Sequence, residues 1–69
     1  MAARDKAKDD KLFNCALIYE LDYVAGLYEE NSAVVKYFLQ SNCQKGNLKD
    51  RTYLEVYNLV KEYLGFEQN

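Results

Sequence analysis

The sequence predicts an all-α fold, a compact three-helix bundle with a flexible or helix-extending charged N-terminus. Apolar residues recur three and four positions apart through most of the chain, as the buried face of a helix requires. No stretch alternates apolar and polar residues for long enough to indicate a half-buried strand. The length of 69 residues suits one domain, and the absence of proline permits uninterrupted helices.

The first ten residues differ in composition from the rest of the chain. They contain no large apolar residue after Met1 and carry charges of both signs. Such a segment is expected to be either a frayed tail or a solvated extension of the helix that follows. We therefore divide the chain into a charged N-terminal tail, residues 1–10, and a single three-helix domain, residues 11–69. The expected helices span about 11–30, 32–44 and 52–64.

The first predicted helix, residues 11–30, is apolar on two sides. Its main face consists of residues spaced by three and four, namely Phe13, Leu17, Leu21, Val24 and Tyr28. Leu12, Tyr19 and Tyr23 project to roughly the opposite side, because successive residues of a helix are about 100° apart. A surface helix of a monomer normally buries one stripe only. This helix is therefore expected either to run through the middle of the bundle or to meet another molecule.

The second predicted helix, residues 32–44, lies between residues that commonly begin and end helices. Asn31 or Ser32 can accept hydrogen bonds from the free amides of the first turn. Gly46 suits the left-handed conformation that often ends a helix. Leu48 is the one apolar residue of the following turn and is expected to pin that turn onto the core. The residues expected to face inward are Val34, Val35, Phe38 and Leu39.

The third predicted helix has the clearest boundaries. Thr52 and Glu55 are three residues apart and form the pattern of a capping box, with Asp50 as the rival N-cap. Gly65 suits the residue after the last turn, and Phe66 is expected to fold back onto that turn. The predicted inward face consists of Tyr53, Val56, Tyr57, Val60, Tyr63 and Leu64.

The composition argues against a self-contained enzyme. The chain has no histidine, so it lacks the commonest general base and the commonest metal ligand. Its two cysteines cannot close a four-thiolate zinc site. A chain this short also leaves little room for a deep ligand pocket. We therefore predict no enzymatic activity, no catalytic residue, no metal, no cofactor and no small-molecule substrate.

The two cysteines, Cys15 and Cys43, bear on the compartment in which the protein works. A small secreted domain normally carries several disulfides, and the N-terminus lacks the apolar run of a secretory signal. The most apolar stretch, residues 12–28, contains two carboxylates and is too short to span a bilayer. We therefore predict a cytoplasmic protein without membrane contact, in which both cysteines are free thiols. A single Cys15–Cys43 bridge that closes one loop is the alternative.

Seven tyrosines are the most prominent feature of the composition. Tyrosine commonly fills half-buried positions with its ring inside and its hydroxyl in water. It is also enriched at binding hot spots. Because the first predicted helix has a second apolar face, we predict a non-catalytic interaction module that binds a protein partner or a second copy of itself. The candidate interface residues are Leu12, Tyr19, Tyr23 and Tyr37.

The alternative function is a small helix-turn-helix-like DNA-binding or transcription regulatory domain. Residues 31–51 carry four basic residues against one acidic residue, although the whole chain has a net charge of −2. Acidic residues at the start of the third helix would meet phosphates unfavourably, so nucleic acid is the disfavoured partner. The candidate phosphate contacts are Lys36, Lys45, Lys49 and Arg51.

Overall fold

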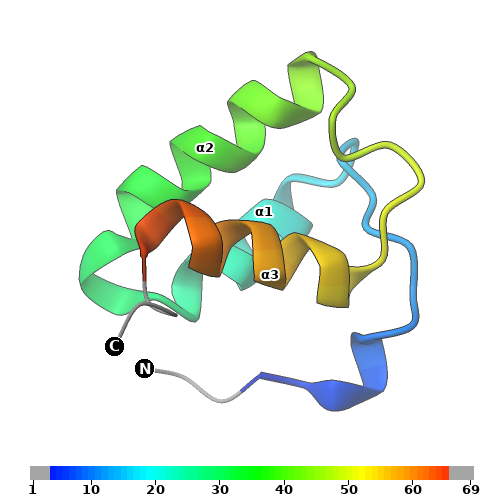
Figure 1. Cartoon of the computed structure of the whole chain (residues 1–69), viewed down its shortest axis with the longest axis horizontal. Helices are drawn as coiled ribbons and strands as arrows, with labels where there is room; N and C mark the ends of the chain where they lie inside the picture. The colour runs from blue at the N-terminus through cyan, green and yellow to red at the C-terminus, as the bar shows by residue number, and fades with distance from the viewer. Residues whose placement is uncertain (1–3, 66–69) are drawn as a thin grey trace.

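The computed structural model describes residues 4–65 and contains three α-helices. Helix α1 spans Ile18–Gly26, α2 spans Ser32–Gln44 and α3 spans Tyr53–Leu64 (Figure 1). Single turns of 3-10 helix lie at Lys6–Lys8 (η1) and Glu29–Asn31 (η2). The described residues form no strand, and their Cα atoms have a radius of gyration of 11.0 Å. The prediction of a compact all-α fold with three helices is therefore confirmed.

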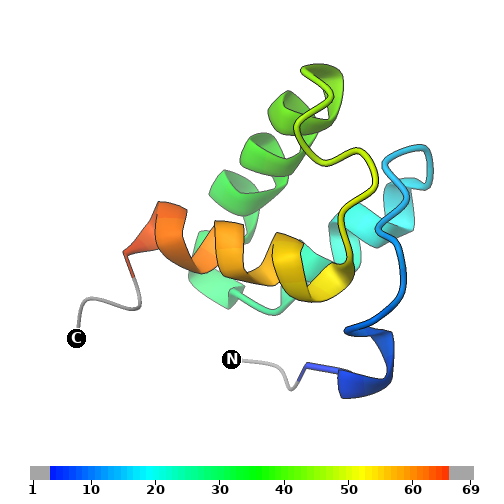
Figure 2. The ribbon, with the colours of Figure 1, turned by 45° about the vertical axis from the view of Figure 1, so that its right-hand side comes forward.

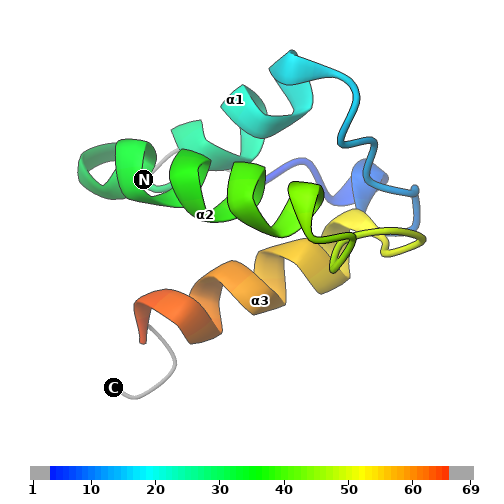
Figure 3. The ribbon, with the colours of Figure 1, turned by 90° about the horizontal axis from the view of Figure 1, so that it is seen from above.

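The three helices enclose one core. Helix α2 runs antiparallel to α1, and seen from above it lies between α1 and α3 (Figure 3). Phe13, before α1, and Leu48, between α2 and α3, also lie in the apolar interior. No charged residue in the described part of the chain is buried. Leu48 therefore pins the loop before α3, as predicted. The most completely enclosed side chains are Val24, Val35, Leu39, Leu48, Val56, Tyr57 and Val60.

The first helix is much shorter than the predicted 11–30. Residues 11–13 are extended instead, because they pair with the segment that leads into α3: the Phe13 amide donates to the Arg51 carbonyl at 2.8 Å, and the Tyr53 amide donates to the Lys11 carbonyl at 2.9 Å. Leu17 precedes α1 in an extended conformation and makes no side-chain cap. Pairing with a distant segment thus prevails over local helical periodicity.

The prediction that both cysteines are free thiols is wrong. Cys15 and Cys43 form a disulfide, with 5.8 Å between their Cα atoms, so the alternative of a single bridge is correct. The bridge joins the segment before α1 to the last turn of α2. The predicted cytoplasmic location therefore loses the support of free thiols, because disulfides are rare in reducing compartments. No helix in the described part of the chain is long and apolar enough to cross a bilayer.

Helix α3 begins and ends as its sequence predicts. The Glu55 amide donates to the Thr52 hydroxyl, and the Thr52 amide donates to the Glu55 carboxylate, so the capping box is complete and Asp50 is not the N-cap. The hydrogen bond from the Thr52 amide holds the pKa of Glu55 below its ordinary value. Gly65 ends the helix with a φ of 76°. The predicted contact of Phe66 with this turn lies outside the described residues.

Helix α2 follows η2 and has no side-chain cap, although Asn31 occupies the N-cap position. Gly46, one residue beyond its C-cap, has the left-handed φ of 78° that the sequence predicts. Val35 and Leu39 are buried as expected, and Phe38 packs partly buried against the core. The inward prediction is wrong for Val34, which is exposed.

The N-terminal residues from Arg4 onward are neither a frayed tail nor an extension of α1. We call residues 4–13 the strap. The strap passes beneath the first turns of α3 and then runs beside the loop that joins α2 to α3 (Figure 2). In addition to the pairing of residues 11–13, the Leu54 amide donates to the Asp9 carbonyl at 3.2 Å. The chain thus uses its charged N-terminus as a cover for one side of the bundle.

Candidate interaction surface

The four predicted interface residues lie on three different segments and differ in exposure. Tyr19 on α1 and Tyr37 on α2 are strongly exposed, at 63% and 72%. Leu12 is exposed but belongs to the strap, where it forms an isolated antiparallel bridge with Thr52. Tyr23 is only partly exposed, and it is engaged within the chain. Helical periodicity placed Leu12 beside Tyr19 and Tyr23 only under the assumption that residues 11–30 form one continuous helix.

Tyr23 contacts the strap and α3. Its hydroxyl accepts a hydrogen bond from the Asp5 amide at 2.8 Å, and the Lys8 ammonium lies 4.3 Å from its ring centroid. Its ring also meets the Tyr53 ring edge to face, with 6.3 Å between centroids. The strap therefore covers Tyr23 on the second apolar face of the first helix, whereas Tyr19 on the same face stays exposed.

A different aromatic surface joins α2 to α3. The rings of Phe38 and Tyr63 are stacked, with centroids 4.2 Å apart and planes at 28°. Tyr63 is nevertheless 52% exposed and Val34 is 46% exposed, so the inward prediction for Tyr63 is also wrong. Val34, Tyr37 and Phe38 occupy neighbouring positions on α2, because residues three and four apart share a helix face. We call the surface formed by Val34, Tyr37, Phe38 and Tyr63 the aromatic face.

The aromatic face continues into a pocket between the C-terminal part of α2 and the first half of α3. The pocket has a volume of about 660 Å³, and Phe38 and Leu59 supply its apolar walls. Its other walls are polar and include Asn42, Arg51 and Glu55. A partner that covers the aromatic face can therefore place polar groups in this pocket.

The spacing of Val34, Tyr37 and Phe38 was the sequence signal for this surface. Residues at i, i+3 and i+4 share a helix face, but that face was divided between an inward and an outward assignment. The position of Tyr63 had no such signal, because its exposure depends on where α3 ends relative to α2.

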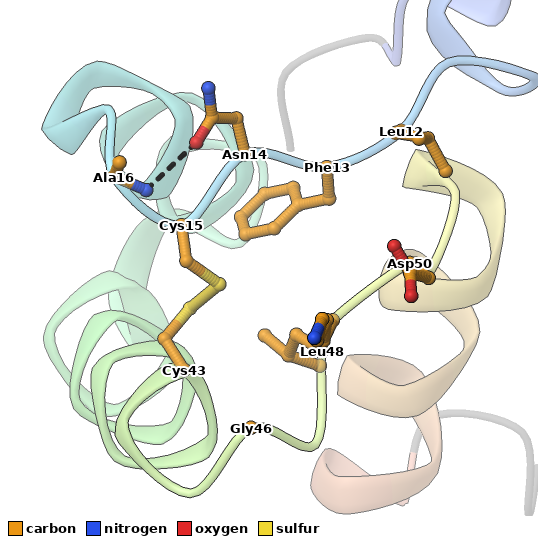
Figure 4. A pocket seen from close by; sticks show the side chains of 10 residues that line it. Leu12, Phe13, Asn14, Cys15, Ala16, Cys43, Gly46, Leu48 and Asp50 are labelled. Carbon is orange, nitrogen blue, oxygen red and sulfur yellow. Dashed lines mark hydrogen bonds between the residues drawn. A yellow bond between two sulfur atoms is a disulfide. The ribbon is translucent and has the colours of Figure 1, made fainter.

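A second pocket, of about 560 Å³, lies at the other end of the strap. The Cys15–Cys43 disulfide forms one side, Leu12 and Asp50 lie at the opposite edge, and Phe13 points into the space between (Figure 4). Beside the disulfide, the Ala16 amide donates a local hydrogen bond to the Asn14 side chain. The pocket is mainly apolar and open. The described residues contain no cluster of potential metal ligands.

Two of the four predicted phosphate contacts form ion pairs with carboxylates of the same chain. The Lys36 ammonium lies 2.7 Å from the Asp22 carboxylate, and Arg51 lies 3.6 Å from Glu55. Arg51 also donates from Nε to the Asn47 carbonyl at 2.8 Å. The other two candidates are exposed residues of the α2–α3 loop, Lys45 and Lys49. Pairing with carboxylates reduces the positive field that Lys36 and Arg51 could present to phosphates.

Two other tyrosines, Tyr28 and Tyr57, are buried in the core. Burial raises the pKa of the Tyr57 hydroxyl, and the neighbouring Tyr23 hydroxyl raises it further. Burial also raises the pKa of Tyr28, and Arg4 opposes that effect. These groups are therefore neutral at physiological pH and act as parts of the core.

Comparisons with known proteins give no information about function, so the proposal below depends on the geometry of the chain. No protein family matches the chain, and neither a curated protein nor a solved structure is similar to it.

Proposed function

We propose that this chain is a non-catalytic interaction module that binds a protein partner, or a second copy of itself, through the aromatic face. The observation that carries the proposal is the Phe38–Tyr63 stack, because it joins two helices and still leaves Tyr63 half exposed. Tyr37 and Val34 extend the same face along α2. Aromatic residues with large exposed area are the usual centres of protein interfaces, since they bury much surface at a low entropy cost.

The size of the aromatic face favours a weak and reversible contact. Two half-exposed or fully exposed tyrosines and one valine present on the order of 300 Å² of side-chain surface. A standard interface buries roughly 800 Å² on each partner. The partner must therefore also contact polar surface around the face, such as the walls of the pocket beside Phe38.

Tyr19 is a flanking element of this proposal. The ion pair between Asp22 and Lys36 links α1 to α2, and each of its residues is close in sequence to an exposed tyrosine. A partner broad enough to reach Tyr19 from Tyr37 must cover or displace this pair. We therefore place the centre of the interface at Tyr37 and Tyr63.

Sedimentation equilibrium tests self-association directly. We expect concentration-dependent dimer formation by the native chain, and association at least about 30-fold weaker for Tyr37→Ser, because removing a hot-spot side chain costs about 2 kcal/mol or more. Asn58→Ser is the matched control, because Asn58 is an exposed polar residue on a side of α3 away from Tyr63. Equal association of both variants would overturn the self-association form of the proposal.

A partner of another sequence is tested by affinity capture from the native host with the same three proteins. The proposal requires a protein that binds the native chain and Asn58→Ser but not Tyr37→Ser. A native chain that stays monomeric and shows no such Tyr37-dependent capture would refute an interaction role for the aromatic face.

A further inference from the structure

The strap places a lysine over two tyrosine rings. The Lys8 ammonium lies 4.3 Å from the centroid of Tyr23 and 5.5 Å from the centroid of Tyr53. The two rings meet at 74°, so one cation can face both. An ammonium group within about 6 Å of an aromatic face is attracted by the ring quadrupole. Tyr23 and Tyr53 thus form an aromatic cation site that this chain fills with its own side chain.

We propose that the Tyr23–Tyr53 pair is a recognition site for the lysine ammonium group of a protein partner, and that Lys8 occupies the site in cis until the strap is displaced. The occupant itself identifies the ligand chemistry, because it already makes the contact that a partner lysine would make. The proposal concerns a different part of the molecule from the aromatic face and does not depend on it.

The attachment of the strap permits this displacement. Beyond the Cys15–Cys43 disulfide, the strap is held at its end by the buried ring of Phe13, whose centroid lies 5.4 Å from that of Tyr53. The rest of the strap is held by three backbone hydrogen bonds to residues 51–54, by the bond from Asp5 to Tyr23, and by cation–aromatic contacts. The disulfide lies at the base of the strap, so residues 4–11 can lift while residue 15 stays bonded to α2. Opening therefore leaves the segment before α1 crosslinked to α2.

Two polar atoms of the closed strap are buried without hydrogen-bond partners among the described residues. Arg4 pairs with Asp9 at 3.2 Å, but Arg4 Nε and Asp9 Oδ1 are buried without a hydrogen-bond partner among the described residues. Buried polar atoms without partners lower the stability of the arrangement that buries them. Lifting the strap returns both atoms to water, and their hydration offsets part of the free energy that opening requires. A partner lysine then has to compete with the cation–aromatic contacts of Lys8 and Arg4 and with a few hydrogen bonds.

Titration with tetramethylammonium chloride tests the site, with the tyrosine ring signals followed by NMR. The variant Lys8→Gln keeps most of the side-chain stem and removes the cis cation, while Lys6→Gln changes an exposed lysine of the same turn that contacts neither ring. We expect saturable shifts of Tyr23 and Tyr53, with a half-saturating concentration about fivefold lower in Lys8→Gln than in the native chain or Lys6→Gln. Uncharged tert-butyl alcohol, of similar shape, should not produce them.

Equal titrations in all three proteins would overturn the proposal, and so would equal shifts with tert-butyl alcohol. Hydrogen exchange of the native chain provides an independent measurement. The Tyr53 and Leu54 amides donate to strap carbonyls, so tetramethylammonium should accelerate their exchange severalfold relative to the same concentration of sodium chloride. Exchange at these amides that does not respond to the cation would contradict cis occupancy by Lys8.

Discussion

Reduction of the Cys15–Cys43 disulfide should remove a large part of the stability of the domain. The two cysteines are 28 residues apart in sequence, so the bridge closes a loop of that length. The chain-entropy relation for a loop of this size gives about 3.5 kcal/mol of stabilisation at 25 °C. A core of this size supplies roughly 3–5 kcal/mol by itself, so the bridge contributes a comparable amount.

Urea unfolding of the native chain, measured by circular dichroism with and without a phosphine reductant, gives the difference in the free energy of unfolding. We expect a loss of about 3.5 kcal/mol, which corresponds to a fall in Tm of about 20 °C for a domain of this length. The double variant Cys15→Ala/Cys43→Ala with reductant present and absent is the control, because it separates loss of the bridge from any other effect of the reductant.

A loss below about 1 kcal/mol on reduction would refute this reasoning, because it falls well short of the chain-entropy value. It would mean that the bridged segments stay together in the unfolded ensemble, or that the bridge restrains little of the chain. The hydrogen bonds of Phe13 and Tyr53 would then have to hold the segment before α1 without covalent help.

Two further predictions concern α3 and the buried tyrosines. Replacing Thr52 by Ala should lower the free energy of unfolding by about 1 kcal/mol, whereas Thr52→Ser should retain the cap; equal urea midpoints for the two variants would contradict the capping role. The raised pKa values of Tyr28 and Tyr57 predict stability that is fully present below the ordinary tyrosine pKa of 10.0 and is lost as the pH rises above it. In an alkaline titration followed by tyrosinate absorbance, two tyrosines should ionise only as circular dichroism reports unfolding, and ionisation of all seven in a folded chain would contradict this.

Local sequence signals predicted the fold class and the third helix. Thr52, Glu55 and Gly65 act through contacts within one or two helical turns, so their roles can be inferred without knowledge of distant segments. Leu48 was also assigned correctly, because an isolated apolar residue in a polar turn has few alternatives to the core.

The first helix shows where such local inference fails. Residues 11–17 have helical periodicity, but three of these residues bond to partners elsewhere in the chain. Lys11 and Phe13 form backbone hydrogen bonds with the segment before α3, and Cys15 bonds to Cys43. Phe13 is buried in either conformation, so the apolar pattern could not distinguish a helix from an extended segment that packs against the same core.

The correction of the first helix also changes where the surplus apolar surface lies. The sequence placed that surplus on the first helix, at Tyr19 and Tyr23. In the structure, the strap contacts Tyr23 through the Asp5 amide and the Lys8 ammonium group. The charged N-terminus therefore covers the part of this face that contains Tyr23. No corresponding cover reaches Tyr37 or Tyr63 from the described residues, and both remain more than half exposed. The exposed tyrosines Tyr37 and Tyr63 therefore lie on α2 and α3, and on α1 only Ile18 and Tyr19, at its start, are large apolar residues that remain exposed.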